Sequence, residues 1–477
     1  MQRDHSTTCP LDGHIEPGDI GYYAQSPSLM FCAALSPRFG PRGHVVLADF
    51  SRVVYLSNII DSLLTAGHFA RAVSPPCPRS QCDRGGAAQL LDPAYRRQPV
   101  GVGGTVKITD IESIILRLPV VRAIGDGCQS VLLIRVHTDE GLVGIGEAHT
   151  NPLVSKAILD APLCSVSAEG LRSLLIGEDP RDIGRLWDKM YKHSATYGRR
   201  GALMHAISGI DIALWDLLGK IAGLPVHRLL GGPRRDAVRA YASDLSQPDL
   251  GDTIALARRH REAGFKAMKF GWGGLGQDPR ADARAVAAIR AEIGDAMDLM
   301  IDIGVPMPLD DALYLGRAFA DSGVYFLEEP LSPDDVSGFA RLVAQSPTPI
   351  ATGEKETTQY PYLDLMDRGG LRIIQPDIAR VGGISEAVRI VHHAEARGAR
   401  VIPHCWSTDI LVAATLHVLA VQREAPYLEF NATDNPLRTD LLAEPMRVVD
   451  GLVRVPDGPG LGITLNDDTI ERYRWNG

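Results

Sequence analysis

The run LMID at residues 299–302 opens a series of short apolar segments, each of which carries an acidic residue or a histidine at or near its end. The carboxylates of Asp302, Glu328 and Glu354 are separated by two equal gaps of 26 residues. A gap of this length holds one strand, loop, helix and loop of a parallel βα unit, so the spacing predicts consecutive parallel strands. The other segments are YFLEEP (325–330), PIATGE (349–354), RIIQPD (372–377), RVIPH (400–404) and YLEF (427–430).

Residues 236–440 alternate apolar, strand-like runs with helix-like stretches about eight times. Two further strands, VRAYAS (238–243) and KAMKFG (266–271), precede the series above. Between the strands lie stretches such as ISEAVRIVHHAEARGA (384–399), whose small and aliphatic residues recur at helical spacing. Eight βα repeats predict an α/β fold closed into a barrel, with functional side chains at the carboxyl ends of the strands.

Residues 106–235 predict a smaller α+β domain that precedes the barrel. Its first part alternates apolar and polar residues as strands do, and its second part carries apolar residues at helical spacing. The Gly- and Pro-rich residues 441–477 are expected to return to this domain. The expected elements are a strand from Lys107, two strands within 131–149 joined by a turn at 139–141, and helical segments at 153–193 and 199–222.

Residues 1–105 differ in composition from the rest of the chain, because they are rich in Pro, Gly, Ser and Arg. We expect them to form a poorly ordered N-terminal extension that adds nothing to function. The alternative is a small regulatory or docking segment. Truncation to residue 105 with activity retained would exclude that alternative.

The composition of the 477-residue chain, 45% hydrophobic and 22% charged, is that of a globular protein. Its net charge of -9 argues against nucleic acid or an anionic membrane as the main partner. No apolar run approaches the ~20 residues of a membrane span, and the first residues lack a secretory signal, so we expect a cytoplasmic protein. The seven cysteines are expected to be reduced thiols, and the spacing of Cys77 and Cys82 does not favour zinc.

Three carboxylates that end consecutive strands would point into one mouth of the barrel. Their mutual repulsion would raise their pKa values unless a cation lies between them. Hard carboxylate oxygens without cysteine or histidine partners favour Mg²⁺, which keeps positions open for substrate oxygens. A loop salt bridge would explain any one of these residues, but the shared placement of Asp302, Glu328 and Glu354 favours a Mg²⁺ site.

Asp377 and His404 end neighbouring strands further along the barrel. An aspartate beside a histidine fixes the tautomer of the ring and raises its basicity, so this pair could take and return a proton near neutral pH. Alone, His404 could equally be a core histidine. Glu429 lies one strand further and could donate a hydrogen bond if it is protonated, which burial near other acids would favour. Proton abstraction next to a substrate carboxylate is the chemistry that such a cation and base allow.

From about residue 107 to residue 470, the chain resembles the mandelate racemase subgroup of the enolase superfamily, within the mandelate racemase/muconate lactonizing enzyme family. The resemblance implies a modified TIM barrel, (β/α)7β, with an α+β capping domain and a homo-oligomer of two to eight subunits. The motifs that carry it are GIDIALWDLLGKIAG (209–223) with LLGG following, GFKAMK (264–269), the D...EEP...GE series, QPDIARVGGISE (375–386) and PH (403–404).

The same resemblance implies roles for individual residues. Asp302, Glu328 and Glu354 would bind Mg²⁺. His404 with Asp377 would form the catalytic dyad, and Glu429 would assist the enediolate that forms when the α-proton leaves.

Two departures from the family pattern bear on the reaction. Many relatives carry Lys-x-Lys at the second barrel strand, whereas this chain has Lys269-Phe270-Gly271, so the second lysine is absent. Relatives also often carry Asp-x-Asn at the third strand, where this chain has Asp302-Ile303-Gly304. Without a base on the second face of the substrate, racemisation is disfavoured. Lys269 is then expected to contact the substrate carboxylate as a fixed cation rather than to act as a base.

The leading hypothesis is a Mg²⁺-dependent dehydratase, a hydro-lyase that converts an aldonic or aldaric acid sugar into a 2-keto-3-deoxy acid. One histidine could take the α-proton and return it to the departing β-hydroxyl on the same side. The alternatives are a racemase, epimerase or cycloisomerase of a related carboxylic acid, and a metal-binding scaffold without catalysis.

Specificity is expected in two loops of the capping domain, residues 119–129 and the segment after Glu147. Arg122, His149 and Asn151 are polar groups there that could meet sugar hydroxyls, although each could equally be an ordinary exposed loop residue. Trp406, two residues after His404, could wall the pocket or simply pack in the core.

Overall fold

The computed structural model describes residues 104–125 and 127–476, so the extension expected over residues 1–105 lies almost entirely outside the described part. The described chain opens with an antiparallel sheet of three strands in the order β1-β2-β3. The strands β2 and β3 form the hairpin that the sequence predicts. The bounds are Ile108–Arg117 for β1, Ser130–Thr138 for β2 and Val143–Ala148 for β3.

The helical segment predicted over residues 153–193 is wrong as a single element, because the structure divides it into three helices. The first ends at Asp160, because the backbone of the next residue, Ala161, is extended (ψ 132°), the conformation that the following Pro162 imposes. The second ends before Gly177, whose φ of +81° is outside the helical region. The helices of this domain are α1 Pro152–Asp160, α2 Leu171–Leu175, α3 Ile183–His193, α4 Ala202–Ala222 and α5 Val226–Leu229, with a 3-10 turn, η2, at Gly127–Gln129.

Helix α4 is the core of the capping domain and ends at Gly223, as its sequence predicts. It contacts β3 on one side and, on another, the barrel helices α11 (Ile378–Val381) and α12 (Gly383–Ala396). The contact with β3 is between backbones, since a Cβ atom on Gly146 would lie 2.0 Å from the carbonyl oxygen of Gly209. By length and composition α4 could also cross a membrane, but most of its apolar window is buried inside the protein, as expected of a core helix.

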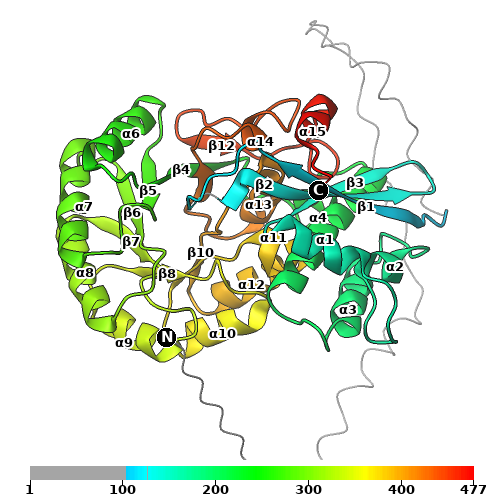
Figure 1. The fold of residues 1–477 in the computed structure, drawn as a ribbon, viewed down its shortest axis with the longest axis horizontal. Helices are drawn as coiled ribbons and strands as arrows, with labels where there is room; N and C mark the ends of the chain where they lie inside the picture. The colour runs from blue at the N-terminus through cyan, green and yellow to red at the C-terminus, as the bar shows by residue number, and fades with distance from the viewer. Residues whose placement is uncertain (1–103, 126, 477) are drawn as a thin grey trace, which may run out of the picture. The chain divides into compact units, whose positions relative to one another are not determined.

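Eight parallel strands and their helices form the second domain, in the sheet order β10-β9-β8-β7-β6-β5-β4-β11. Helices α6 to α9 follow one another around the outside of β5 to β8 (Figure 1). This is the modified TIM barrel, (β/α)7β with an α+β cap, that the sequence predicts. The strands are β4 Ala237–Leu245, β5 Ala267–Gly271, β6 Asp298–Asp302, β7 Val324–Glu328, β8 Ile350–Thr352, β9 Ile373–Ile374, β10 Arg400–Val401 and β11 Leu428–Asn431. The helices are α6 Leu250–Glu262, α7 Pro279–Ile293, α8 Leu309–Asp321, α9 Val336–Gln345, α10 Gln359–Asp367, α11 Ile378–Val381, α12 Gly383–Ala396 and α13 Asp409–Val421.

Side chains from successive barrel strands fill the interior of the barrel as a separate buried cluster. Because side chains alternate across a strand, the neighbouring positions point outward into the helix layer. The interior cluster consists of Tyr241, Ala267, Met300, Phe326, Ala351, Ile373, Ile402 and Tyr427.

The last described residues contact both the barrel and the capping domain. The strand β12 pairs antiparallel with β4, while the backbone N–H of Trp475 donates to the carbonyl oxygen of Ile115 in β1 at 2.8 Å. The backbones of Arg474 and Leu116 also form an isolated antiparallel β-bridge. The elements of this segment are α14 Pro436–Thr439, β12 Leu452–Arg454 and α15 Asp467–Tyr473.

A buried carboxylate on α4 ties the two domains together and should make the stability of the fold depend on pH. Asp211 accepts hydrogen bonds from the backbone N–H of Ser385 in α12 at 2.9 Å and from the Ser385 hydroxyl at 2.6 Å. Burial raises the pKa of Asp211 from 3.8 to about 7. The stability that this group contributes is fully present below pH 3.8 and is lost as the pH rises through 7, since ionisation is easier in the unfolded chain.

We expect the free energy of unfolding to fall by about 3 kcal/mol between pH 5 and pH 8 through this group alone. Asp211→Asn should remove that part of the pH dependence, because an amide does not ionise. Urea unfolding of the native protein and the variant at both pH values measures the difference. An unchanged pH slope in the variant would contradict the prediction.

Candidate active site

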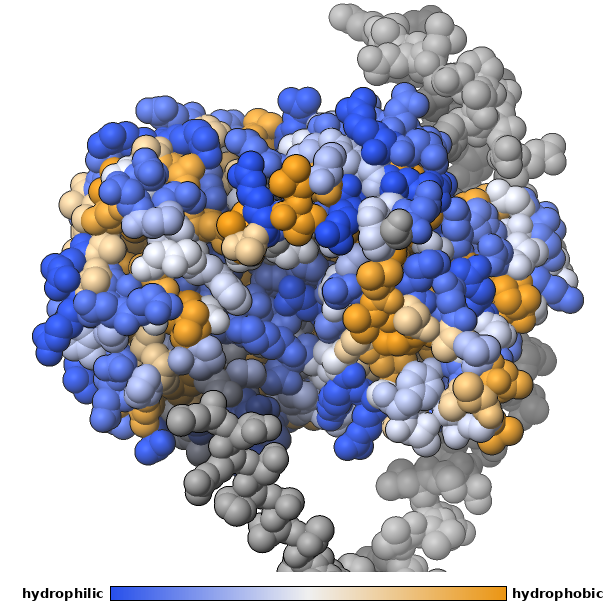
Figure 2. All heavy atoms as spheres, viewed as in Figure 1, coloured by the Kyte–Doolittle hydropathy of each residue, from blue (hydrophilic) through white to orange (hydrophobic). Residues whose placement is uncertain are grey.

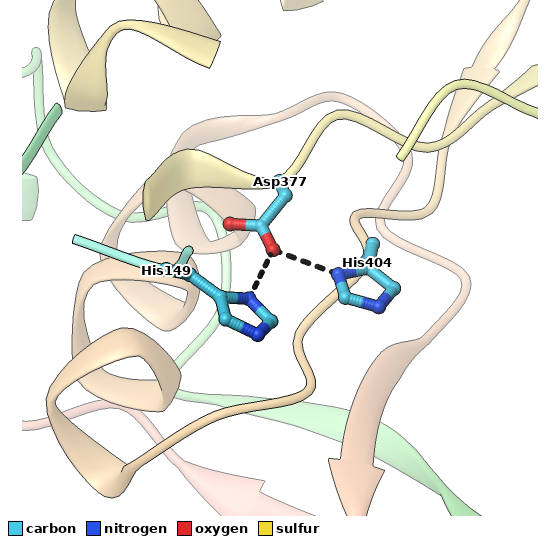
Figure 3. A group of neighbouring side chains, drawn as sticks. All are labelled: His149, Asp377 and His404. Atoms are coloured by element: carbon cyan, nitrogen blue, oxygen red, sulfur yellow. Dashed lines mark hydrogen bonds and ion pairs between the residues drawn. The ribbon is translucent and has the colours of Figure 1, made fainter. Parts of the chain in front are cut away.

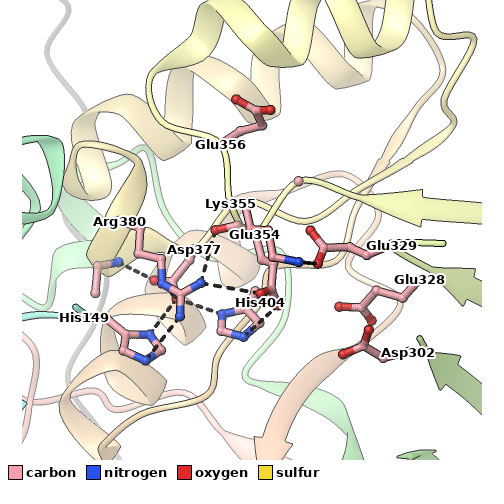
Figure 4. A network of polar contacts seen from close by, with 12 residues as sticks. His149, Asp302, Glu328, Glu329, Glu354, Lys355, Glu356, Asp377, Arg380 and His404 are labelled. Atoms are coloured by element: carbon pink, nitrogen blue, oxygen red, sulfur yellow. Dashed lines mark hydrogen bonds and ion pairs between the residues drawn. The ribbon is translucent and has the colours of Figure 1, made fainter. Parts of the chain in front are cut away.

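Three carboxylates meet where three neighbouring strands end. Asp302 is the last residue of β6, Glu328 is the last residue of β7, and Glu354 follows β8 by two residues. Because parallel strands bring their carboxyl ends to one edge, a carboxylate oxygen of each side chain lies within 4.8 Å of the others. All three side chains are buried, and Figure 4 shows the carboxylates of Asp302 and Glu328 facing each other.

The electrostatics of this cluster are those of a cation site. Burial and the charge of Glu328 raise the pKa of Asp302 well above its usual value, and burial also raises the pKa of Glu328. Burial would raise the pKa of Glu354 as well, but the positive charges of His404 and Arg380 outweigh it and hold that pKa at about 2.

Two carboxylate oxygens of this cluster accept no hydrogen bond from the described residues. Among the described residues, Asp302 Oδ1 and Glu328 Oε1 are buried without a hydrogen-bond partner. Buried, unpaired carboxylate oxygens are costly unless a cation binds them. The residues therefore fit a hard divalent ion that takes oxygen ligands.

Lys269 lies inside the barrel next to the carboxylate cluster. Its Nζ atom is 2.8 Å from Glu328 Oε2 and 2.8 Å from Glu429 Oε1. Burial lowers the pKa of Lys269, but the two glutamates more than offset burial and raise that pKa well above its usual value. Lys269 is therefore a fixed cation at neutral pH and does not have the neutral amine that a base requires.

The surroundings of Glu429 favour its ionised form, whereas the sequence allowed for a protonated carboxyl that could donate a hydrogen bond. It lies in β11 and accepts hydrogen bonds from the Ser243 hydroxyl at 2.7 Å and from the backbone N–H of Cys405 at 2.7 Å. Burial raises its pKa, but Lys269 and His404 outweigh burial, and the net pKa lies below the usual value. The sequence could not show this, because Lys269, which lowers the pKa of Glu429, lies in β5 and is far from Glu429 along the chain.

His404 and Asp377 form the pair that the sequence predicts. The Nδ1–H of His404 donates to Asp377 Oδ2 at 2.8 Å, which leaves Nε2 facing Glu354 Oε2 at 3.1 Å. Asp377 is itself fixed, since its Oδ1 accepts from the backbone N–H of Ala379 at the start of α11. Burial lowers the pKa of His404, but the charges of Glu354 and Glu429 outweigh it and raise that pKa to about 9.

A second histidine, His149, shares the same aspartate oxygen. Its Nδ1–H donates to Asp377 Oδ2 at 2.9 Å, and its ring stacks on that of His404 with centroids 5.8 Å apart (Figure 3). Burial and the charge of Arg380 lower the pKa of His149 to about 4, so its ring is neutral. The sequence placed His149 in a specificity loop and gave no sign of its contact with Asp377, from which 228 positions separate it.

Of the other loop residues that the sequence singled out, Asn151 caps α1 by accepting from the backbone N–H of Leu153 at 3.1 Å. Arg122 hydrogen-bonds through its backbone to the side chain of Gln129. Neither belongs to the described residues that line the cavity at the barrel mouth, whereas Trp406 does.

That cavity has a volume of about 260 Å³ and lies between the capping domain and the strand ends. The face drawn in Figure 2 is hollowed near its centre, where the residues are mostly hydrophilic. The cavity brings together the side chains described above. Its lining includes Gly125, Gly127 and His149 of the cap and Lys269, Trp272, Asp302, Glu354, Lys355, Arg380, His404, Trp406 and Glu429 of the barrel.

Comparison with known proteins places both domains in one family. Residues 105–231 match the model of the mandelate racemase / muconate lactonizing enzyme N-terminal domain, and residues 252–469 match that of the enolase C-terminal domain-like family. The chain is 36% identical to D-galactarolactone cycloisomerase of Agrobacterium fabrum over 72% of its own length and 91% of that protein. It is 33% identical to arabinonate dehydratase of Saccharolobus solfataricus, over 74% of its length and 93% of that protein. The crystal structure of 3,6-anhydro-D-galactonate cycloisomerase from Zobellia galactanivorans superimposes with a TM-score of 0.71 at 32% identity, covering 78% of this chain and 100% of that one.

Proposed function

Because the chain belongs to the mandelate racemase/muconate lactonizing enzyme family of the enolase superfamily, we propose that it is a Mg²⁺-dependent dehydratase of an aldonic or aldaric acid. One observation carries the proposal. Asp377 holds the rings of both His404 and His149, but Nε2 of His149 accepts from Arg380 at 3.3 Å, whereas Nε2 of His404 faces Glu354 in the cavity. The other candidate base, Lys269, is held as a cation by two glutamates. Proton transfer is therefore confined to one face of the substrate.

The residues divide the chemistry between them. A Mg²⁺ ion held by Asp302, Glu328 and Glu354 would stabilise the negative charge that develops on the substrate carboxylate. The ammonium of Lys269 adds a second positive charge at a fixed place beside that carboxylate. No base other than His404 is needed.

The proton path runs through His404. In its neutral form, which is favoured once the charge of Glu354 is balanced, Nε2 takes the α-proton while Asp377 keeps the proton on Nδ1. The electron pair of the broken C–H bond forms the α,β double bond. The β-hydroxyl leaves with the proton that His404 returns, so water is lost, and the enol tautomerises to the 2-keto-3-deoxy acid.

A cycloisomerase is the second candidate, because one relative at 36% identity is named D-galactarolactone cycloisomerase. Such an enzyme would also take a proton next to a carboxylate or lactone carbonyl, and would not release water. A racemase is less well supported, since the second lysine is absent at Gly271. A non-catalytic scaffold is disfavoured, because the metal cluster and the proton-transfer pair meet in one cavity.

Incubating the protein with Mg²⁺ and a panel of acid sugars in D₂O tests the proposal. We expect at least one acid to give a 2-keto-3-deoxy product, detected by its reaction with semicarbazide or by mass loss of one water. A solvent deuteron at the α-carbon without loss of water, with no dehydration of any acid in the panel, would reject the dehydratase in favour of the cycloisomerase or racemase. The homo-oligomer and the cytoplasmic location stay predictions, which sedimentation and cell fractionation would test.

A further inference from the structure

Both departures from the family pattern lie around one side chain, the indole of Trp272. Gly271 precedes Trp272 in the chain, at the end of β5, and Gly304 follows Asp302 by two residues. A Cβ atom on Gly271 would lie 2.7 Å from the Cβ of Asp302, and a Cβ on Gly304 would lie 2.6 Å from Cε2 of the indole. The two glycines therefore leave the space that the indole and the Asp302 side chain occupy.

Trp272 contacts Asp302 twice. The indole Nε1–H donates to Asp302 Oδ2 at 3.1 Å, and the backbone N–H of Trp272 points to the carbonyl oxygen of Asp302 at 3.4 Å. Trp272 has a φ of +57°, a conformation that a bulky residue rarely adopts and that costs free energy. A cost of this kind is expected where the surrounding structure holds a side chain in one place.

The indole is also held from two other directions. The Nζ of Lys355, the residue after Glu354, lies 5.6 Å from the centroid of the ring, within range of a cation–π interaction. Lys355 in turn is paired with Glu329, as Figure 4 shows. On the side of the capping domain, a Cβ on Gly125 would lie 3.3 Å from the Cβ of Trp272. The loop that covers the barrel mouth thus reaches this residue.

The two carboxylate oxygens of Asp302 therefore have different surroundings. Oδ2 accepts from the indole, while Oδ1 has no hydrogen-bond partner among the described residues. A carboxylate held at one oxygen presents the other in a defined direction. Removing a group that fixes a ligand in this way typically lowers the metal affinity by about 10- to 100-fold.

We propose that Trp272 is a positioning residue for the cation site, which fixes the Asp302 carboxylate through Oδ2 so that Oδ1 faces Glu328 and Glu354. The glycines at positions 271 and 304, where many relatives have lysine and asparagine, make room for the indole. The indole N–H supplies a polar group at the third strand in place of that asparagine. The proposal rests on the proposed cation site and does not depend on which sugar acid is the substrate.

Binding of Mn²⁺ to the metal-free, full-length protein tests the proposal, measured by calorimetry or by the electron paramagnetic resonance of the free ion. Trp272→Phe keeps an aromatic wall and removes the N–H donor, so we expect its Kd for Mn²⁺ to rise by about 10- to 100-fold. A Kd unchanged from the native value in a folded variant would overturn the proposal, whether or not any sugar acid is ever turned over.

Gly304→Ala tests the same contact from the other side and remains available if Trp272→Phe does not fold. It keeps the N–H donor but pushes the indole away from Asp302, so its Kd should also rise. Gly398→Ala is the matched control, since Gly398 has nearly the same φ (+65° against +64°) with open space around its Cβ. Equal effects of the two alanines on Mn²⁺ binding would mean that backbone strain alone is responsible, and would overturn the proposal. In the double variant Trp272→Phe/Gly304→Ala, the loss in free energy of Mn²⁺ binding should be smaller than the sum of the losses in the two single variants, because both substitutions act through one contact.

Discussion

His404→Asn should lower the turnover of the sugar acid by about 10²- to 10⁴-fold while leaving the affinity for Mg²⁺ nearly unchanged. The reason is that Asp377 fixes the tautomer of His404 through a donated Nδ1–H, which leaves Nε2 facing Glu354 in the cavity. Nε2 of His149, the other histidine on Asp377, instead accepts from Arg380 at 3.3 Å. The amide of asparagine can still hydrogen-bond to Asp377 but cannot take a proton. Steady-state kinetics with the acid found in the panel gives the first quantity, and calorimetry with Mg²⁺ gives the second.

A control separates the loss of the base from general damage to the fold. His137 lies in β2, is paired with Glu112 and is far from the barrel mouth in sequence and in sheet position. His137→Asn should therefore keep native turnover. Equal activity in His404→Asn and the native protein would show that His404 is not the base, and a large loss of Mg²⁺ affinity would show that it serves the cation site instead.

Gly146→Ala should destabilise the fold by about 3 kcal/mol, a large part of the roughly 5–15 kcal/mol that stabilises a typical domain. Gly146 lies in β3 against α4, and its new methyl group would meet the carbonyl oxygen of Gly209 at 2.0 Å and the backbone nitrogen of Ala213 at 2.9 Å. Both neighbours are backbone atoms inside a helix, so they cannot turn aside as a flexible side chain would. Urea unfolding followed by circular dichroism measures the loss.

Gly184 provides a control of the opposite sign. It lies in α3 with no atom within 4 Å of the position that a Cβ would take. Alanine there should stabilise the protein by about 0.5–1 kcal/mol, because glycine is a poor helix former. If Gly146→Ala unfolded at the same urea concentration as the native protein, the close contact between β3 and α4 would be wrong.

The barrel could be predicted because its signal is local and repeated. The 26-residue spacing of Asp302, Glu328 and Glu354 places three side chains at three strand ends without knowledge of any long-range contact. The same local reasoning failed over residues 153–193, where apolar residues continue but Pro162 and Gly177 divide the helix.

The remaining features of the site depend on contacts between distant segments. His149 reaches Asp377 only because α4 and β3 place the end of the capping sheet over the barrel mouth. The ionisation of Glu429 depends on Lys269, a residue whose own sequence motif looked incomplete. The glycines at 271 and 304 looked like losses in the sequence, and only the position of the indole explains why they occur together.

The β-bridge between Leu116 and Arg474 also has a consequence for folding of the chain during its synthesis. The strand β1 forms the edge of the capping sheet, and 358 positions separate the two residues that meet there. During synthesis the ribosome releases the sheet long before it releases the segment that covers this edge. An uncovered strand edge can pair with another chain. Nascent chains should therefore be most prone to aggregation in the interval before residues 474 and 475 emerge, and a chaperone that shields β1 during that interval would raise the yield of folded protein.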